Sequence, residues 1–122
     1  MTQTISFGYG SKPAQFVANK LNRHGVIAGA TGTGKTVTLK VLAEQLSEAG
    51  VPVFLSDIKG DLASLAEKGE VTEKIAERLA KVHLEDFEPS SYPVAFWDVF
   101  GKNGINIRTT ISEMGPILLA QL

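Results

Sequence analysis

The sequence predicts an α/β fold in three layers, with helices covering a sheet of parallel strands. Three consecutive segments carry this prediction: "GVIAG" is a short apolar run that closes in glycine, "KTVTLKVLAEQLSEAG" has helical spacing, and "VPVFLSD" is again apolar and β-branched. Because a helix lies between the two apolar runs, we expect strands Val26–Ala28 and Val51–Leu55 to pair in parallel through a crossover connection. Together the three segments form one βαβ unit.

The composition is that of one globular domain. The 122 residues include 43% hydrophobic and 20% charged positions, without the bias of a disordered chain. The formal net charge of −1 excludes a protein that binds nucleic acid through a strongly basic overall composition. A local basic patch is still compatible with this charge. The absence of cysteine excludes disulfides and thiolate zinc sites. The start of the chain lacks the pattern of a signal peptide, and no apolar run has the length of a membrane span, so we expect a cytoplasmic protein that contacts no membrane.

The central helix is the clearest element. Its apolar residues Val37, Val41, Leu42 and Leu46 fall on one face, and its polar residues fall elsewhere. Gly50 stands where a helix C-cap belongs. The spacing therefore predicts a helix that starts at the lysine of "GKT" and ends just before Gly50.

Two further helices follow. Asp61 is placed to cap a short helix over "LASLAEKG", and Thr72 is placed to cap a longer one over "EKIAERLAKVHL". The longer helix has a narrow apolar stripe on one side, formed by Ile75, Leu79 and Val82. Its mixed charges are typical of a solvated face, and the alternative for Arg78 is an arginine finger for a neighbouring subunit.

The two ends of the chain are less regular. The first 23 residues have a weak pattern, in which "SFGYG" is interpreted as a turn. Near the other end, "VAFWDVF" is a third strand candidate, and "GKNG" is the turn after it. The last segment, "RTTISEMGPILLAQL", has the look of a capping box, with Thr110 three residues ahead of Glu113. His24 and His83 have no partners at metal-ligand spacing and are interpreted as structural.

The segment between the first strand and the central helix carries a phosphate-binding motif. It fits GxxxxGK[ST] through Gly29, Gly34, Lys35 and Thr36, with Gly32 as an extra glycine inside the loop. Glycines let backbone N–H groups converge on a phosphate, and the helix N-terminus adds partial positive charge. The alternative is a loop that merely turns the chain, but a turn requires neither the lysine nor the last threonine. The predicted cofactor-binding residues are Gly29, Ala30, Thr31, Gly32, Thr33, Gly34, Lys35, Thr36 and Val37.

The side chains of the motif predict ATP and Mg²⁺ as cofactors. Lys35 brings a mobile cation to the β and γ phosphates, and the Thr36 hydroxyl is placed to ligate Mg²⁺. Asp57 and Gly60 also match the DxxG element of GTPases by letter. That match fails on context, because no switch segment fits between Lys35 and Asp57 and no NKxD guanine reader is present.

At this point a family resemblance becomes visible. The stretch "NRHGVIAGATGTGKTVTLKVLAEQLSEAGVPVFLSDIKGDLASLA" closely resembles the HerA-like branch of the HerA/FtsK P-loop ATPases, and "EDFEPSSYPVAFWDVFGKNGINIRTTISEMGPILLAQL" continues the resemblance. It implies a RecA-like P-loop NTPase core, usually in a hexameric homo-oligomer that drives DNA translocation with ATP hydrolysis. Gly29–Thr36 take the Walker A role, and the residues of "DIKGD" match the family's "DxKGD" stretch.

The resemblance also implies what the 122 residues lack. In that family the Walker B acid, the catalytic glutamate and the sensor residues come well after the position where this sequence stops. We therefore expect residues 1–122 to be the N-terminal part of a single ATPase domain, incomplete at the C-terminus. We expect this chain alone to bind nucleotide without appreciable turnover.

Two acids are weak catalytic candidates. Asp57 lies at the carboxyl end of a predicted parallel strand, the edge where α/β sheets bind ligands, and its alternative role is a local contact with the following turn. Asp98 ends "VAFWD", which has the form of a Walker B strand but no adjacent glutamate, and its alternative role is to anchor a turn. Two rival functions stay open: a small-molecule P-loop kinase and a nucleotide-binding module without turnover.

Overall fold

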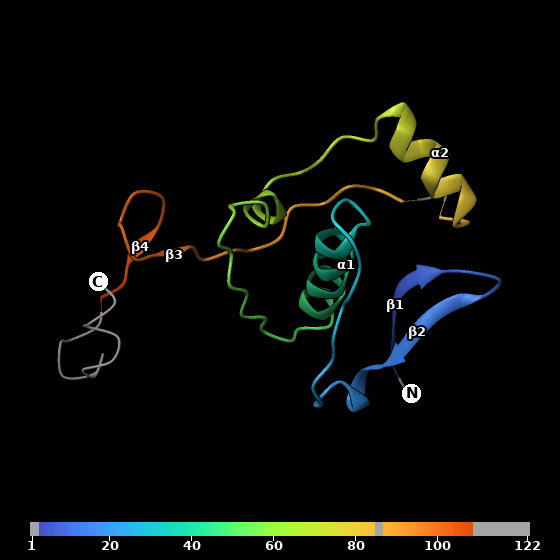
Figure 1. Cartoon of the computed structure of the whole chain (residues 1–122), viewed down its shortest axis with the longest axis horizontal. Helices are drawn as coiled ribbons and strands as arrows, with labels where there is room; N and C mark the ends of the chain where they lie inside the picture. Colours follow the sequence, from blue (N-terminus) through green and yellow to red (C-terminus); the bar gives the residue numbers. More distant parts are fainter. Residues whose placement is uncertain (1–2, 85–86, 109–122) are drawn as a thin grey trace. The chain divides into compact units, whose positions relative to one another are not determined.

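A computed structural model describes residues 3–84 and 87–108 of the chain. The chain divides into two units, Met1–Tyr92 and Pro93–Leu122. In chain order the elements are β1 (Thr4–Tyr9), β2 (Pro13–Val17), the 3₁₀ helix η1 (Ala18–Lys20), α1 (Lys35–Glu48), the 3₁₀ helix η2 (Ala63–Ala66), α2 (Glu73–Lys81), β3 (Trp97–Asp98) and β4 (Ile105–Asn106) (Figure 1).

The first unit begins with an antiparallel hairpin, β1–β2. Thr4 pairs with Val17 and Ile5 with Phe16, and the register shifts between Ser6 and Gly8. Ile5 is only 1% exposed and is the most deeply buried large side chain among the described residues. The interpretation of "SFGYG" as a turn is therefore wrong. The signal that it missed is the alternation of apolar and small or polar residues along β1, which is the period of a strand.

The predicted central helix is confirmed as α1, which begins at Lys35 and ends just before Gly50 as expected. The chain leaves it through a Schellman motif, in which the Gly50 N–H donates to Ser47 O at 2.9 Å and the Val51 N–H donates to Leu46 O at 2.9 Å. Gly50 has φ +76°, the left-handed conformation that this motif requires. The predicted apolar face is corrected at one position, because Val37 is 61% exposed while Ala43 is the buried residue of α1.

The Gln45 side chain of α1 bonds to the backbone of the hairpin. The Ser6 N–H donates to Gln45 Oε1 at 2.8 Å, and the Gln45 side-chain amide donates back to the Ser6 carbonyl. Gln45 thus provides hydrogen-bond partners for both backbone groups of Ser6, which lies next to the register shift of the hairpin. A polar side chain of α1 therefore contributes to the contact between this helix and β1.

The predicted parallel sheet is not confirmed. Neither Val26–Ala28 nor Val51–Leu55 forms a strand, and the described residues instead form short sheets in a small mixed α/β arrangement. Val26 is 92% exposed and Phe54 is 79% exposed, so these segments are not covered as parallel strands require. The correction has a physical reason: apolar runs form parallel strands only when helices bury both faces of their sheet, and the described residues bury neither run.

The two later helices are confirmed, with one correction. Thr72 is the N-cap residue of α2, in extended conformation, although its side chain makes no cap hydrogen bond. The short helix is the single 3₁₀ turn η2, and its N-cap is Leu62 rather than the predicted Asp61. The acid that bonds to the start of this turn is Asp57, whose Oδ2 accepts the Leu62 N–H at 3.0 Å.

The second unit contains β3 and β4. The third strand candidate is confirmed only at Trp97–Asp98, which pair in parallel with Ile105–Asn106. Gly101, in the predicted "GKNG" turn, has φ +64°. A Cβ on Gly104 would lie 2.5 Å from the Phe96 carbonyl oxygen, so glycine is needed where the chain passes β3. The predicted helix start at Thr110 and Glu113 lies outside the described residues.

Candidate functional site

The motif segment Gly29–Thr36 leads directly into α1. Gly34 is the N-cap residue of the helix, and Lys35 is its first residue. Residues 29–33 are exposed, and residues 34–36 are half-buried. The helix N-terminus is therefore accessible from solvent at the position where the sequence predicts a phosphate site.

Backbone geometry or a close contact explains why glycine occurs at each of three positions in the loop. Gly32 and Gly34 have φ +81° and +92°, the left-handed region that costs other residues about 1–2 kcal/mol. A Cβ on Gly29 would lie 2.5 Å from Thr33 Oγ1, so this glycine permits the loop to close on itself. The glycine spacing of the motif thus matches the turns that the backbone makes.

The Ala30 carbonyl oxygen accepts several hydrogen bonds inside the loop. Ala30 O accepts the Thr33 hydroxyl at 2.8 Å and the Lys35 ammonium at 2.7 Å. The Thr33 N–H approaches the same oxygen at 3.4 Å. Lys35 is therefore folded back over the loop, and its ammonium group lies beside the turn in an exposed position.

The start of α1 offers unpaired donors. No acceptor among residues 3–84 and 87–108 is assigned to the backbone N–H groups of Lys35, Thr36 and Val37, whereas the Thr38 N–H donates to Gly34 O at 2.9 Å. The first N–H groups of a helix point along its axis and carry partial positive charge. Together with Lys35 they form a cationic, donor-rich surface that is chemically suited to bind an oxyanion.

Asp57 anchors a turn by its carboxylate. Its Oδ1 accepts the Gly60 N–H at 2.8 Å, and its Oδ2 accepts the Leu62 N–H. Desolvation raises the pKa of Asp57, but backbone hydrogen bonds from Leu62, Gly60 and their neighbours outweigh it, so the pKa lies below its usual range. The local contact that was the alternative to a catalytic role is present in the structure.

In the second unit, the Asp98 carboxylate also anchors a turn. Its Oδ1 accepts the Phe100 N–H at 2.8 Å, and its Oδ2 accepts the N–H groups of Lys102 and Asn103 at 2.7 and 2.9 Å. The bonds from Asn103 and Phe100 lower the pKa of Asp98, and they outweigh the opposing effect of desolvation. Both oxygens of this carboxylate are occupied by the turn that joins β3 to β4.

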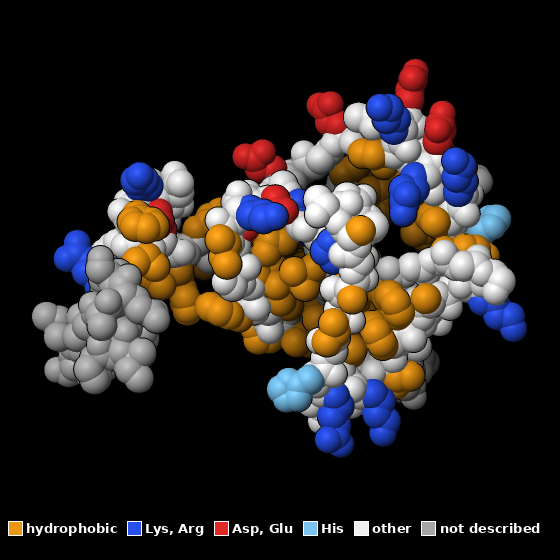
Figure 2. Space-filling model, in the orientation of Figure 1, with side chains coloured by type: hydrophobic (Ala, Val, Ile, Leu, Met, Phe, Trp, Pro, Cys, Tyr) orange, Lys and Arg blue, Asp and Glu red, His pale blue; other side chains and the backbone are white. Residues whose placement is uncertain are grey.

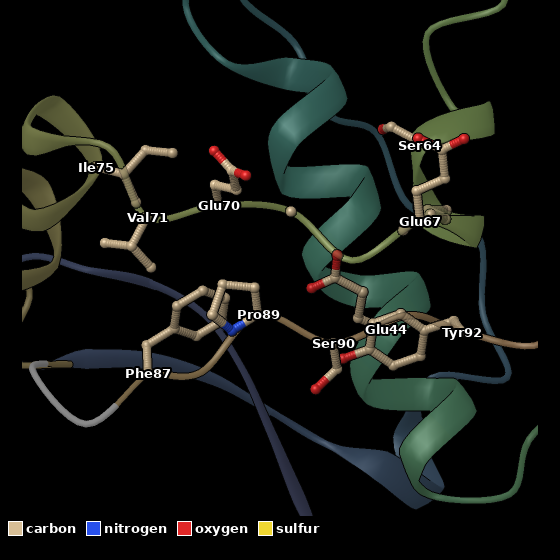
Figure 3. Close-up of a pocket in the computed structure, with 12 residues that line it drawn as sticks. Glu44, Ser64, Glu67, Glu70, Val71, Ile75, Phe87, Pro89, Ser90 and Tyr92 are labelled. Carbon is tan, nitrogen blue, oxygen red and sulfur yellow. The ribbon is translucent and has the colours of Figure 1, made fainter.

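A cavity of about 210 Å³ lies apart from the motif. Figure 3 shows the apolar side chains of Val71, Ile75 and Phe87 at one end, and Glu44 and Tyr92 at the other. No residue of 29–36 lines it. The sequence analysis did not find this cavity, because its lining comes from separate segments that share no motif.

Two ionisable groups of this cavity are perturbed. Burial, and then the charge of Glu48, raise the pKa of Glu44, while Lys40 opposes the shift. The Tyr92 hydroxyl donates to Glu48 Oε1 at 2.7 Å. Burial and this hydrogen bond raise the pKa of Tyr92 far above its usual range. The cavity wall therefore holds a tyrosine that stays protonated.

The described residues give no sign of a metal cluster or of a membrane segment. No group of three or more His, Cys, Asp or Glu residues among them is arranged to hold a metal ion. His83 contacts the Tyr9 ring, with ring centroids 5.0 Å apart, which confirms a packing role for this histidine. No helix in this part of the chain is long and apolar enough to cross a bilayer.

Comparison with known proteins gives one match. A family model described as helicase HerA-like C-terminal matches residues 3–122. The HerA-like resemblance is thereby confirmed, but the matching model is that of the C-terminal region, which corrects the predicted placement in the N-terminal part of the ATPase core. No curated protein and no solved structure matches the chain.

Proposed function

Since this chain belongs to the helicase HerA-like C-terminal family, we propose that it is the ATP- and Mg²⁺-binding part of a HerA-like motor ATPase. The observation that carries the proposal is the position of Lys35, the first residue of a helix whose N-cap is a left-handed glycine. A solvent-facing glycine loop, a lysine and a helix N-terminus meet at this point.

Phosphate binding follows from the charges and donors at this point. The phosphates of ATP carry negative charge, and the N–H groups of residues 35–37 would donate to their oxygens. Lys35 would exchange the neutral Ala30 carbonyl for an anionic acceptor, and hydrogen bonds between charged groups are about twice as strong as neutral ones. The loop would therefore bind a phosphate with little change in its backbone.

Thr36 would contribute to Mg²⁺ binding. It lies one residue into α1, beside Lys35, and no hydrogen-bond partner among the described residues is assigned to its hydroxyl. Mg²⁺ prefers oxygen ligands and is usually held by one or two protein groups together with substrate phosphates. When bound, the ion would neutralise charge on the β and γ phosphates.

Hydrolysis and DNA translocation belong to the proposed assembly rather than to the residues of this site. In Asp57 and in Asp98, both carboxylate oxygens accept hydrogen bonds from backbone N–H groups. This occupancy supports nucleotide binding without turnover by the described residues. A homo-oligomer, with a hexamer as the form implied by the family resemblance, and DNA as its partner complete the proposal.

The experiment is a titration of the purified chain with ATP, with and without Mg²⁺. We expect Mg²⁺ to increase the affinity for ATP, and Thr36→Ala to remove most of that increase. Thr38→Ala is the matched control, because its hydroxyl bonds to the Gly34 carbonyl at 3.2 Å on the same helix. ATP and GTP should compete within about tenfold, since phosphate contacts dominate. Equal loss of the Mg²⁺ effect in both threonine variants would contradict the role of Thr36.

A further inference from the structure

The loop between β3 and β4 contains the dipeptide Asn103–Gly104. No other asparagine of the chain precedes a glycine, because the residues that follow Asn19, Asn22 and Asn106 are lysine, arginine and isoleucine. Both residues of the dipeptide are exposed. Figure 2 shows white and blue atoms at the tip of this loop, on the face that the view presents. Solvent therefore reaches both the asparagine and the glycine.

The backbone of Asn103 is held by the turn, while its side chain is free. The Asn103 N–H donates to Asp98 Oδ2 at 2.9 Å. No hydrogen-bond partner among residues 3–84 and 87–108 is assigned to the Asn103 carboxamide or to the Gly104 N–H. Neither of these two groups has to break a hydrogen bond with the described protein before it reacts.

Packing against β3 requires glycine at the second position of the dipeptide. A Cβ on Gly104 would lie 2.5 Å from the Phe96 carbonyl oxygen and 2.7 Å from Phe96 Cβ. The same lack of a side chain leaves the Gly104 backbone nitrogen unshielded. The fold therefore places an unhindered backbone nitrogen directly after an exposed carboxamide.

We propose that Asn103 is a site of spontaneous deamidation, which converts it to aspartate and isoaspartate. The Gly104 backbone nitrogen loses its proton and attacks Cγ of Asn103. The bond between this nitrogen and Cγ forms, the bond between Cγ and Nδ2 breaks, and Nδ2 takes up a proton and leaves as ammonia. The product is a five-membered succinimide ring.

Water completes the reaction. It adds to one of the two carbonyl carbons of the ring and breaks the bond from that carbon to the ring nitrogen. Attack at Cγ gives aspartate, and attack at the backbone carbonyl carbon gives isoaspartate. One water is consumed and one ammonia is released, so no oxidant, reductant or cofactor is needed. The site belongs to the second unit, and the inference does not depend on nucleotide binding.

Asn106, in the neighbouring strand β4, differs in both respects. Its side-chain amide donates to the carbonyl oxygens of Asp98 and Val99 at 3.2 Å each, and its Oδ1 accepts from Arg108 Nε at 2.8 Å. The next residue, Ile107, is β-branched, and its stiff side chain hinders the approach to its backbone nitrogen. Asn106 is therefore an internal control within the same unit.

Isoaspartate changes the backbone as well as the charge. In this product the chain runs through the former side chain, which inserts one extra carbon before Gly104. The next residue, Ile105, pairs with Trp97 and donates its N–H to the Phe96 carbonyl at 2.8 Å. Because Gly104 already passes close to Phe96, the longer backbone does not fit this pairing. The isoaspartate form therefore loses the β3–β4 pairing, whereas the aspartate form keeps it.

The test is a time course of the purified chain in warm buffer, at neutral and at mildly alkaline pH, followed by peptide mass spectrometry. We expect Asn103 to change from amide to acid at least about tenfold faster than the other asparagines, Asn19, Asn22 and Asn106. The reaction should be faster at alkaline pH, because the attacking nitrogen must lose its proton. Conversion of Asn103 at the rate of the other three asparagines would overturn the proposal.

The same time course in urea tests whether the fold leaves the site open. We expect the folded and unfolded chains to convert Asn103 at rates within about tenfold of each other, because no opening of the described structure is needed. A folded chain that reacts more slowly than this would overturn the proposal, since the fold would then protect the dipeptide.

Two substitutions test the assignment to one residue. Asn103→Gln lengthens the side chain by one carbon, so that a larger ring would have to form, and it should lower the release of ammonia at least about tenfold. The matched control Asn22→Gln should change this release by less than about twofold. Equal effects of the two substitutions would assign the reaction to another residue and would contradict the proposal.

NMR tests the structural consequence after the products are separated by ion exchange. Cross-strand nuclear Overhauser contacts between Trp97 and Ile105 should be present in the unreacted chain and in Asn103→Asp, which has the new charge without the extra backbone carbon. They should be absent in the isoaspartate form. Persistence of these contacts in the isoaspartate form would overturn the predicted loss of β3–β4 pairing.

Discussion

The Gln45 side chain joins α1 to the hairpin by hydrogen bonds to both backbone groups of Ser6. This contact connects the helix that follows the glycine-rich motif with strand β1, which carries Phe7 and Tyr9. We expect Gln45→Met, which keeps the length of the side chain, to lower the free energy of unfolding by about 1–3 kcal/mol, because two half-buried backbone groups lose their partner.

The control is Gln15→Met. Its amide donates only to the Ser6 hydroxyl, at 2.9 Å, in an exposed position. We expect that variant to change the free energy of unfolding by less than about 0.5 kcal/mol. Urea denaturation followed by circular dichroism measures both. Equal destabilisation by the two substitutions would show that Gln45 does not fix the hairpin.

A second prediction concerns Gly34, the N-cap residue of α1, which has a left-handed backbone conformation. Gly34 has φ +92°, so Gly34→Ala should lower the free energy of unfolding by about 1–2 kcal/mol and also weaken ATP binding. Gly25→Ala is the matched control, since no atom lies within 4 Å of a Cβ at that position and its φ is not positive. Denaturation of the two variants, compared with calorimetry of ATP binding, checks the prediction. A Gly34→Ala protein with unchanged stability would mean that the loop adopts another conformation in solution.

A third prediction concerns the effect of pH on the turn at Asp98. The carboxylate of Asp98 accepts three backbone N–H groups, which hold its pKa below the ordinary value of 3.8. A lowered folded-state pKa means that the ionised form stabilises the turn, and that this contribution is present above pH 3.8 and is lost as the pH falls through the folded-state pKa. The turn should therefore open only in acid.

NMR can follow this titration at single residues. The amide proton shifts of Lys102 and Asn103 should move together, with an apparent pKa below 3.8. In the Asp98→Asn variant they should not titrate, and their shifts should resemble those of the acid form. Amide shifts that titrate at or above 3.8 would show that Asp98 does not anchor this turn.

Sequence and structure agree best where the signal is local. The helix α1 and its exit at Gly50 follow from apolar spacing and from the conformational freedom of glycine, which act within a few residues. The loop Gly29–Thr36 was predicted for the same reason, because its glycines, lysine and threonine are consecutive. The N-cap position of Thr72 also agrees with the residue type, although its side chain makes no cap hydrogen bond.

The disagreements concern contacts between distant segments. Val26–Ala28 and Val51–Leu55 have the residues of buried parallel strands, but pairing depends on neighbouring strands and on helices over both faces. The Asp57 carboxylate, rather than that of Asp61, bonds at Leu62, because the turn between them brings the earlier acid closer. No pattern in the sequence predicts that Gln45 binds Ser6 across 39 residues.

The central claim is that the loop before α1 binds the phosphates of ATP through the charge of Lys35. The most direct measurement is isothermal titration calorimetry of ATP with Mg²⁺ against the wild-type chain and Lys35→Ala, with Lys12→Ala as a control of equal charge change outside the loop. The account predicts that Lys35→Ala reduces the affinity at least about tenfold, while thermal unfolding stays unchanged and Lys12→Ala binds as the wild type does. Undiminished ATP binding by a folded Lys35→Ala protein would contradict the account.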